Sequence, residues 1–363
     1  MKTPRLARNP WVRVALVLFP AVGVVALLWW RGPDWELVAD AFTVVRWEWV
    51  VAAVGLNLAS VVARAFAWRT VIHHAIPPPH PRFPLVFSAF SVGLFANAVL
   101  PGRVGELARV AVLTRKVPPR DGIWATLVGS VVAHRIFDLF PSLALVVWVL
   151  LSAKIPHWAL TSLEIFAGVG LALFALALLT ARRHPGRSRI DTAVGPVRRV
   201  LTMMRYGLGV MRAPLPALGA LFFQTLGWTC QLFAVWAAMR AFHIYESLPA
   251  AGLVLVMMNI ATILPLWPGN VGLLQAAIAF PLRQYGVPVA KGFAFGLGLQ
   301  AIEACVGIGV GLIFLAREGL SFAMLRHMPD ATQAEIPEIR PPAEQPIEEP
   351  ERLVHRARAS LPR

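Results

Sequence analysis

The sequence predicts an all-α protein that crosses a membrane several times. Hydrophobic residues make up 57% of the chain and charged residues only 15%, and the mean hydropathy is +0.64. Several apolar runs reach the length of about 18 residues that marks a candidate membrane-spanning helix. Proline-glycine pairs interrupt two of these runs. Together these observations favour about six full spans and two re-entrant broken hairpins, with eight full spans as the alternative.

The first predicted span covers residues 14–30, behind a basic leader at residues 1–13. This span ends in "WWRGPDW" without a small-residue cleavage site, so we expect a retained helix rather than a removed signal peptide. The second span covers about 49–71 and holds Arg64. It ends at "IPPPHPRFP", because consecutive prolines cannot continue a helix.

The middle of the chain contains the first helix break. An apolar helix at residues 84–100 meets "PGRVG", and a short polar helix then runs to Lys116. A long apolar segment at about 122–153 contains "HRIFD", and residues 158–181 form another span. The loop at 182–212 holds eight arginines and one acid, which indicates the cytoplasmic side.

The second half of the chain repeats this organisation. Residues 215–239 form a span, and the apolar residues 248–267 are broken by "WPGN". A second short helix is expected at 270–281 and a last span at 289–316. Residues 318–363, rich in proline and glutamate, predict a disordered tail. The basic N-terminus and the arginine-rich loop both lie inside if the two broken segments are hairpins, which places both termini in the cytoplasm.

Composition also argues against several other classes of protein. The net charge of +15 comes mainly from short segments beside apolar runs, and no soluble basic module for nucleic acid is present. No nucleotide-binding motif occurs. Cys230 and Cys305 lie inside apolar stretches without a CxxC motif or histidines at ligand spacing, so we expect neither a metal site nor a cofactor.

The two helix breaks form an internal repeat. "PGRVG" is followed by "VPPRDG", and "PGNVG" is followed by "VPVAKG". Asn97 precedes the first break and Asn259 the second. Under the charge-based topology, two inverted units result at about 49–153 and 215–316, a pattern typical of transporters that bind substrate near the midplane. The alternative is that the pairs are ordinary turns. The predicted break residues are Pro101, Gly102, Gly105, Pro268, Gly269 and Gly272.

Charged residues follow the first break closely. Glu106 and Arg109 are three positions apart and share a helix face, and Arg103 lies just before the helix start. Free N–H groups and the helix dipole at that end favour an anion. Arg103 is therefore a candidate anion ligand, with an ordinary cytoplasmic interface arginine as the alternative.

Four further charges lie within predicted spans, where an unpaired charge is costly. Arg135 and Asp138 are three positions apart and favour a structural or gating pair over a substrate contact. Arg64 and Glu303 either extend toward the membrane surface or pair with each other.

These residues resemble the flippase-like transmembrane domain of lysylphosphatidylglycerol synthases and its stand-alone relatives, over roughly residues 10–318. The family pattern has an Asn-x-x-hydrophobic-Pro-x-Arg-x-Gly-Glu-x-x-Arg stretch, an Arg-x-x-Asp pair and a late Pro-Gly-x-x-Gly block. The matching residues are Asn97, Pro101, Arg103, Gly105, Glu106, Arg109, Arg135, Asp138, Pro268, Gly269 and Gly272.

The resemblance implies a bacterial inner-membrane protein that moves a phospholipid or polyprenyl-phosphate-linked head group between leaflets. The chain departs from the family at three positions: Gln275 and His134 stand where an acid is common, and Gln300 where an arginine is expected. These departures weaken any inherited proton or cation coupling. Only the short tail follows the last span, so lysyl transfer is not expected.

The leading hypothesis is a lipid translocase with a phosphate head group as its partner, and a homo-oligomer is left open. Arg103 and Arg109 would bind the phosphate, and Glu106 would orient them. Further expected substrate contacts are Arg64, Asn97, Asn259 and Gln275. Two alternatives are a membrane enzyme acting on a polyprenyl-phosphate sugar and a transporter of a small anion.

Overall fold

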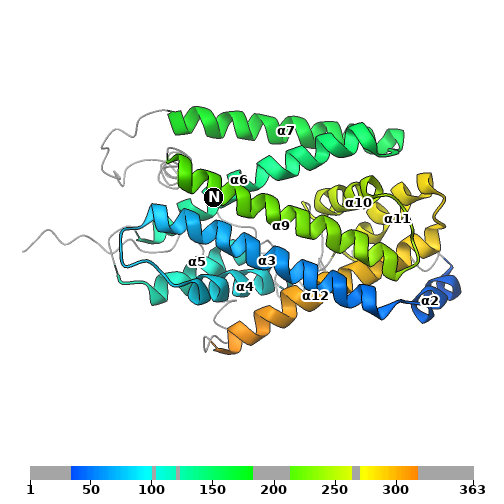
Figure 1. Ribbon diagram of the computed structural model, residues 1–363, viewed down its shortest axis with the longest axis horizontal. Coiled ribbons are helices and arrows are strands. Elements are labelled where there is room, and N and C mark those ends of the chain that lie inside the picture. Colours follow the sequence, from blue (N-terminus) through cyan, green and yellow to red (C-terminus); the bar gives the residue numbers. More distant parts are fainter. Residues whose placement is uncertain (1–33, 100–103, 120–122, 183–212, 264–269, 318–363) are drawn as a thin grey trace, which may run out of the picture. The chain divides into compact units, whose positions relative to one another are not determined.

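The computed structural model of the chain is helical throughout the part it describes (Figure 1). The chain divides into two units, residues 1–321 and 322–363, and every described residue belongs to the first. The predicted first span and tail lie outside the described residues. The described ranges are 34–99, 104–119, 123–182, 213–263 and 270–317.

Four helices in the described residues are long and apolar enough to cross a membrane. They are α3 (Trp47–Ala75), α6 (Ile123–Ser152), α9 (Pro214–Ala241) and α12 (Val289–Arg317), each of 28 to 30 residues. At about 1.5 Å per residue, each exceeds the roughly 30 Å thickness of a hydrocarbon core. The 26-residue α7 (His157–Arg182) is a further long helix at the predicted position. The predicted all-α polytopic membrane fold is confirmed.

Four shorter helices lie between the long ones. They are α4 (Phe83–Val99), α5 (Gly105–Lys116), α10 (Leu248–Ala261) and α11 (Leu273–Leu282). Each has 10 to 17 residues, fewer than the about 20 that a full crossing needs. Helix α4 packs against α5, and α10 packs against α11. A single turn, η4 (Arg283–Tyr285), follows α11.

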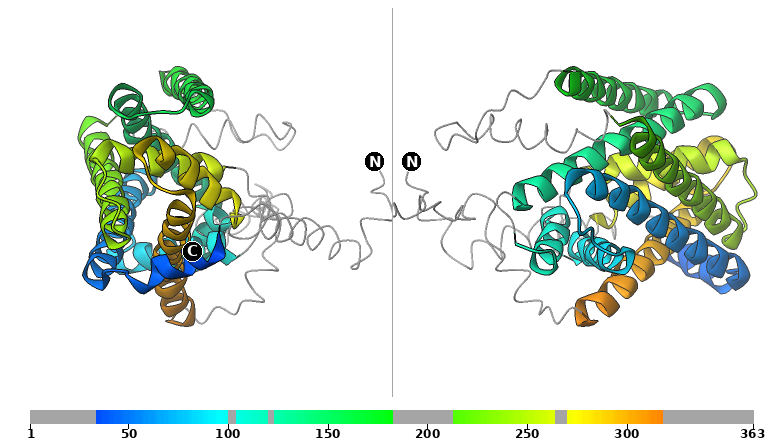
Figure 2. Two further views of the ribbon diagram at one scale, coloured as in Figure 1. Left: turned by 90° about the vertical axis from the view of Figure 1, so that its right-hand side faces the viewer. Right: turned by 60° about the vertical axis from the view of Figure 1, so that its left-hand side comes forward.

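The order of helix lengths occurs twice. Helices α3, α4, α5 and α6 run long, short, short, long, and so do α9, α10, α11 and α12. The two long leading helices, α3 and α9, lie side by side along much of their length (Figures 1 and 2). The inverted relation between the two halves, and the re-entrant nature of the hairpins, stay predictions.

Sequence reasoning did not predict the short helix α2 (Trp35–Thr43), which precedes α3. Asp34 caps it, since its carboxylate accepts hydrogen bonds from the backbone N–H groups of Glu36 and Leu37. Val38 joins the largest group of buried apolar residues, which α9, α10, α11 and α12 supply in the main.

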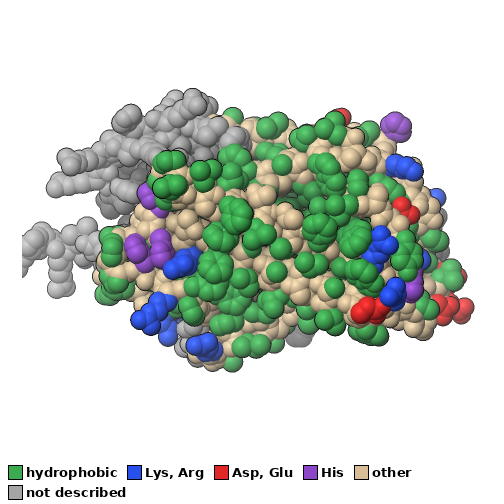
Figure 3. Space-filling model, in the orientation of Figure 1, with side chains coloured by type: hydrophobic (Ala, Val, Ile, Leu, Met, Phe, Trp, Pro, Cys, Tyr) green, Lys and Arg blue, Asp and Glu red, His purple; other side chains and the backbone are tan. Residues whose placement is uncertain are grey.

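The outer surface fits an apolar surrounding. In Figure 3 the middle of the visible face carries apolar side chains, while arginine, lysine and histidine gather toward the two ends. Helix α9 shows the same pattern in detail, because its exposed residues recur at helical spacing along one face. They are Leu215, Leu218, Phe222, Leu226 and Phe233, exposed by 40 to 80%.

Candidate functional site

The first hairpin brings Asn97 to the start of α5. The amide oxygen of Asn97 accepts a hydrogen bond from the backbone N–H of Gly105 at 2.8 Å, and its amide nitrogen donates to Glu106 at 3.2 Å. Gly105 has no room for a side chain, because a Cβ there would overlap the carbonyl oxygen of Gly93 on α4. Two glycines and one asparagine thus fix the second arm of the hairpin against the first.

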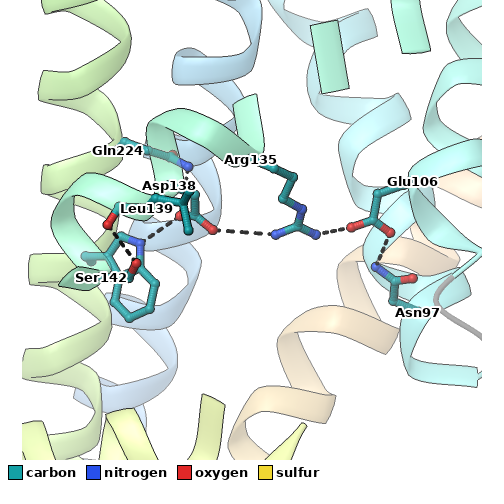
Figure 4. Close-up of polar contacts among 8 residues, drawn as sticks. Asn97, Glu106, Arg135, Asp138, Leu139, Ser142 and Gln224 are labelled. Carbon is teal, nitrogen blue, oxygen red and sulfur yellow. Dashed lines mark hydrogen bonds and ion pairs between the residues drawn. The ribbon is translucent and has the colours of Figure 1, made fainter. Parts of the chain in front are cut away.

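Arg135 on α6 joins this hairpin to the rest of the molecule. Its guanidinium contacts the carboxylate of Glu106 and lies 3.5 Å from that of Asp138 (Figure 4). The predicted pairing of Arg135 with Asp138 is present, one turn apart on α6. The side chain of Arg135 is 48% exposed, whereas those of Glu106 and Asp138 are only 23% and 16% exposed. The cation between the two carboxylates therefore keeps an uncovered surface.

Asp138 is held from the other side by α9. Gln224 and Trp228 donate hydrogen bonds to the same carboxylate oxygen at 2.8 and 2.7 Å. Figure 4 shows the resulting line of polar contacts from Gln224 through Asp138 and Arg135 to Glu106 and Asn97. Three charges from two helices are thus stabilised by neutral groups at both ends.

Arg64 on α3 lies beside this line. Its guanidinium carbon is 5.0 Å from the centroid of the Trp228 ring, a cation–π distance. The missing side chain of Gly227 makes room for it, since a Cβ there would lie 2.9 Å from Cγ of Arg64. The Arg64 Nε–H is buried and finds no hydrogen-bond acceptor among the described residues. Asp138 and Glu303 are the carboxylates whose charges act on Arg64.

Glu303 on α12 belongs to a second polar chain. Gln231 on α9 donates to its carboxylate at 2.8 Å, and the amide oxygen of Gln231 accepts from the hydroxyl of Ser60 on α3 at 3.2 Å. Among the described residues, no ion pair within 4.0 Å involves Glu303. The suggested pairing of Arg64 with Glu303 is thus a proximity rather than a contact.

Arg109 is buried between aromatic rings. Its side chain is 4% exposed, and the guanidinium carbon lies 4.7 Å from the Trp68 ring and 5.5 Å from the Phe90 ring. Its Nε and one terminal nitrogen lack a hydrogen-bond acceptor in the described part of the chain. His134, also buried, lies edge-on to Phe90. Glu106 hydrogen-bonds to Arg135, and Arg109 keeps free N–H groups beside it.

The second hairpin is closed by neutral side chains. Gln275 accepts a hydrogen bond from the backbone N–H of Gly272 at 2.6 Å and donates to Gln300 at 2.6 Å. Gly272 has φ of 92°, a conformation that favours glycine. Asn270 donates to the carbonyl of Ala261 at the end of α10. Two of the three departures from the family pattern, Gln275 and Gln300, thus contact each other.

The remaining predicted site residues do not join the polar line. The amide of Asn259 donates to the carbonyl of Leu255 in its own helix at 2.7 Å. Five residues lie outside the described residues, and their predicted roles stay predictions: Pro101, Gly102, Arg103, Pro268 and Gly269. The described residues contain no group of three or more His, Cys, Asp or Glu side chains that could hold a metal ion.

A family model described as the lysylphosphatidylglycerol synthase TM region matches residues 11–311. The chain belongs to this family. Comparison with curated proteins and with solved structures finds no similar protein. The match to the lysylphosphatidylglycerol synthase TM region includes every residue of both polar chains and links the chain to lipid modification or translocation in a membrane.

Sequence reasoning missed the neutral partners of this family member's charges. Gln224, Trp228 and Gln231 lie at i, i+4 and i+7 on α9, and Ser60, Arg64 and Trp68 lie at i, i+4 and i+8 on α3. Each set occupies one face of an apolar helix, and the two faces meet because α3 and α9 pack together. A search for polar and tryptophan residues at helical spacing would have found both sets.

Proposed function

We propose that the chain is an inner-membrane lipid translocase that moves a lipid with a phosphate-bearing head group between leaflets. Membership of the lysylphosphatidylglycerol synthase TM family supports a role at a membrane lipid. The observation that carries the proposal is the half-exposed Arg135, flanked by Arg64 and Arg109, whose buried N–H groups have no acceptor in the described structure.

Three guanidinium groups of this kind suit an anionic phosphodiester. Planar N–H donors match phosphate oxygens in pairs, which a lysine ammonium cannot do. The head group would displace part of the contact between Arg135 and its carboxylates, and Arg109 would supply donors from the hairpin. Arg103, just before α5, would add a further cation, while Asn97 keeps Glu106 in place. The acyl or prenyl tails would stay in the bilayer.

The proposal includes a topology. Both termini and the arginine-rich loop lie in the cytoplasm, and the hairpins α4–α5 and α10–α11 enter from opposite sides without crossing. The short arms support this, because irregular backbone at membrane depth is tolerated only inside protein or beside a cavity. Cysteine labelling at the turns of the two hairpins in intact cells and in inverted vesicles would test the opposite entry.

The test of function is head-group translocation by purified protein in phosphatidylcholine vesicles. Fluorescent phosphatidylglycerol in the inner leaflet should become accessible to an impermeant quencher faster with protein than without. Arg109→Lys and Glu106→Gln should slow this by about tenfold or more, since each removes roughly 1.4 kcal/mol or more of head-group stabilisation. Arg283→Gln, at an exposed arginine far along the chain, is the matched control.

Two results would redirect the assignment. Uptake of inorganic phosphate into the vesicles without lipid movement would make the chain a small-anion transporter. A change in the mass of an added polyprenyl-phosphate sugar would make it an enzyme. Folded variants that translocate phosphatidylglycerol at the wild-type rate would give the cluster a structural role only.

A further inference from the structure

The charges inside the described membrane helices are balanced before any ligand binds. Arg64, Arg109 and Arg135 face three carboxyls, on Glu106, Asp138 and Glu303. If all six are ionised, an anionic head group adds one uncompensated negative charge in a region of low dielectric, where such a charge is costly. Anion binding is therefore favourable only if one carboxyl loses its charge.

The structure distinguishes the three carboxyls by their partners. Glu106 has Arg135 and Asn97, and Asp138 has Arg135 together with two N–H donors from α9. Glu303 has a single neutral donor, Gln231, and no ion pair within the described residues. Its anion is the least stabilised of the three, so it is the one that accepts a proton at the least cost.

Glu303 also competes for a cation that the head group needs. Arg64 is the charged side chain that acts on it, and the Arg64 Nε–H has no acceptor in the described structure. With Glu303 ionised, the field of its carboxylate draws Arg64 toward α12. With Glu303 protonated, Arg64 is free to pair with a phosphodiester beside Trp228.

We infer that Glu303 binds a proton whenever an anionic lipid head group occupies the arginine cluster, so that the two move across the membrane together. This inference rests on the proposed translocase function. The balance is simple: a proton from water adds to the carboxylate oxygen of Glu303 as the phosphodiester binds, and it returns to water on the opposite side as the lipid leaves. No further reactant is required.

The surroundings of Glu303 contain few other titratable groups. Helices α4 and α11, which pack on α12, carry none, and α9 offers Gln231. Helix α3 offers Arg64, and α2 carries Glu36 and Asp40 beside the opposite end of α12. The remaining nearby groups lie across the cluster on α5 and α6; they are Glu106, Arg109, His134, Arg135 and Asp138.

The test measures proton uptake and lipid binding together. Short-chain phosphatidylglycerol is added to the purified chain in weakly buffered detergent with a pH-sensitive dye. Wild type should take up about one proton for each lipid bound, and its affinity should rise as the pH falls, approaching about tenfold per pH unit. Glu303→Gln should bind the lipid with no proton uptake and no pH dependence, whereas Glu303→Asp should retain both. Glu164→Gln, at an exposed carboxyl on α7, is the matched control.

The other arms separate the explanations. Inorganic phosphate that drives the same uptake would make the site one for free phosphate, and zwitterionic phosphatidylcholine should drive none. Phosphatidylglycerol binding without proton uptake would overturn the inference and leave the translocase intact, and so would pH dependence that survives in Glu303→Gln and disappears in His134→Asn. If wild type neither binds nor moves phosphatidylglycerol at any pH, the proposed function fails and the inference falls with it.

Discussion

Replacement of Gly105 by alanine should destabilise the first hairpin and abolish translocation. The new Cβ would overlap the carbonyl oxygen of Gly93 and lie 2.6 Å from the amide carbon and oxygen of Asn97, whereas real Cβ contacts are not shorter than about 3.0 Å. Helix α5 must therefore move away from α4. The hydrogen bond from Asn97 to the start of α5 is then lost as well.

The cost follows from these two effects. Overpacking of a tight contact typically costs about 1–3 kcal/mol. Loss of a helix cap adds about 1 kcal/mol. Better helix propensity returns up to ~1 kcal/mol. The net loss is roughly 1–3 kcal/mol, or a fall in melting temperature of about 2–12 °C at 2–4 °C per kcal/mol. Gly309 is the matched control, because a Cβ there meets nothing within 4 Å. Gly309→Ala should raise stability by about 0.5–1 kcal/mol.

The assay is thermal unfolding of both variants in the same detergent, followed by head-group translocation in vesicles. The two substitutions add the same methyl group, so opposite signs would show that the close approach of α4 and α5 causes the difference. A Gly105→Ala protein that melts at or above the wild-type temperature would refute the reasoning. Such a result would mean that the helices separate there without loss.

Three further substitutions test individual contacts. Trp228→Phe removes one donor to Asp138 but keeps the ring, so it should cost about 0.5–1.5 kcal/mol of stability by thermal unfolding and slow translocation. A faster rate would contradict a supporting role for that donor. Gln275→Met should cost about 1–3 kcal/mol, because the buried N–H of Gly272 loses its acceptor; unchanged unfolding would refute it. Arg109→Ala should lose about 0.5–2 kcal/mol of cation–π stabilisation, and a more stable variant would show that its buried charge is unfavourable in the empty protein.

Helix positions could be predicted where composition alone sets them. The spans expected at 49–71 and 289–316 became Trp47–Ala75 and Val289–Arg317, since an apolar run bounded by proline or charge leaves few alternatives. The helix at Trp35–Thr43 was missed because its charges suggested a loop. Its cap at Asp34 was a usable signal.

The candidate site could be predicted only in its local parts. Arg135 and Asp138 are one turn apart, so helical geometry alone brings them together. The contact of Arg135 with Glu106 joins residues 29 positions apart and depends on how the hairpin packs against α6. The donors on α9 lie more than 80 positions from Asp138, and no local rule links them.

The unequal support of the two carboxylates around Arg135 decides where these helices separate most easily. Asp138 shares a helix with Arg135 and is also held by two donors from α9, so α6 and α9 keep their contact even if the arginine turns away. Glu106 would then retain only Asn97, which lies in its own hairpin. A single side-chain rotation can therefore uncouple α5 from α6 while every other polar contact of the line persists. The molecule has one weak seam here, between the first hairpin and the long helix beside it.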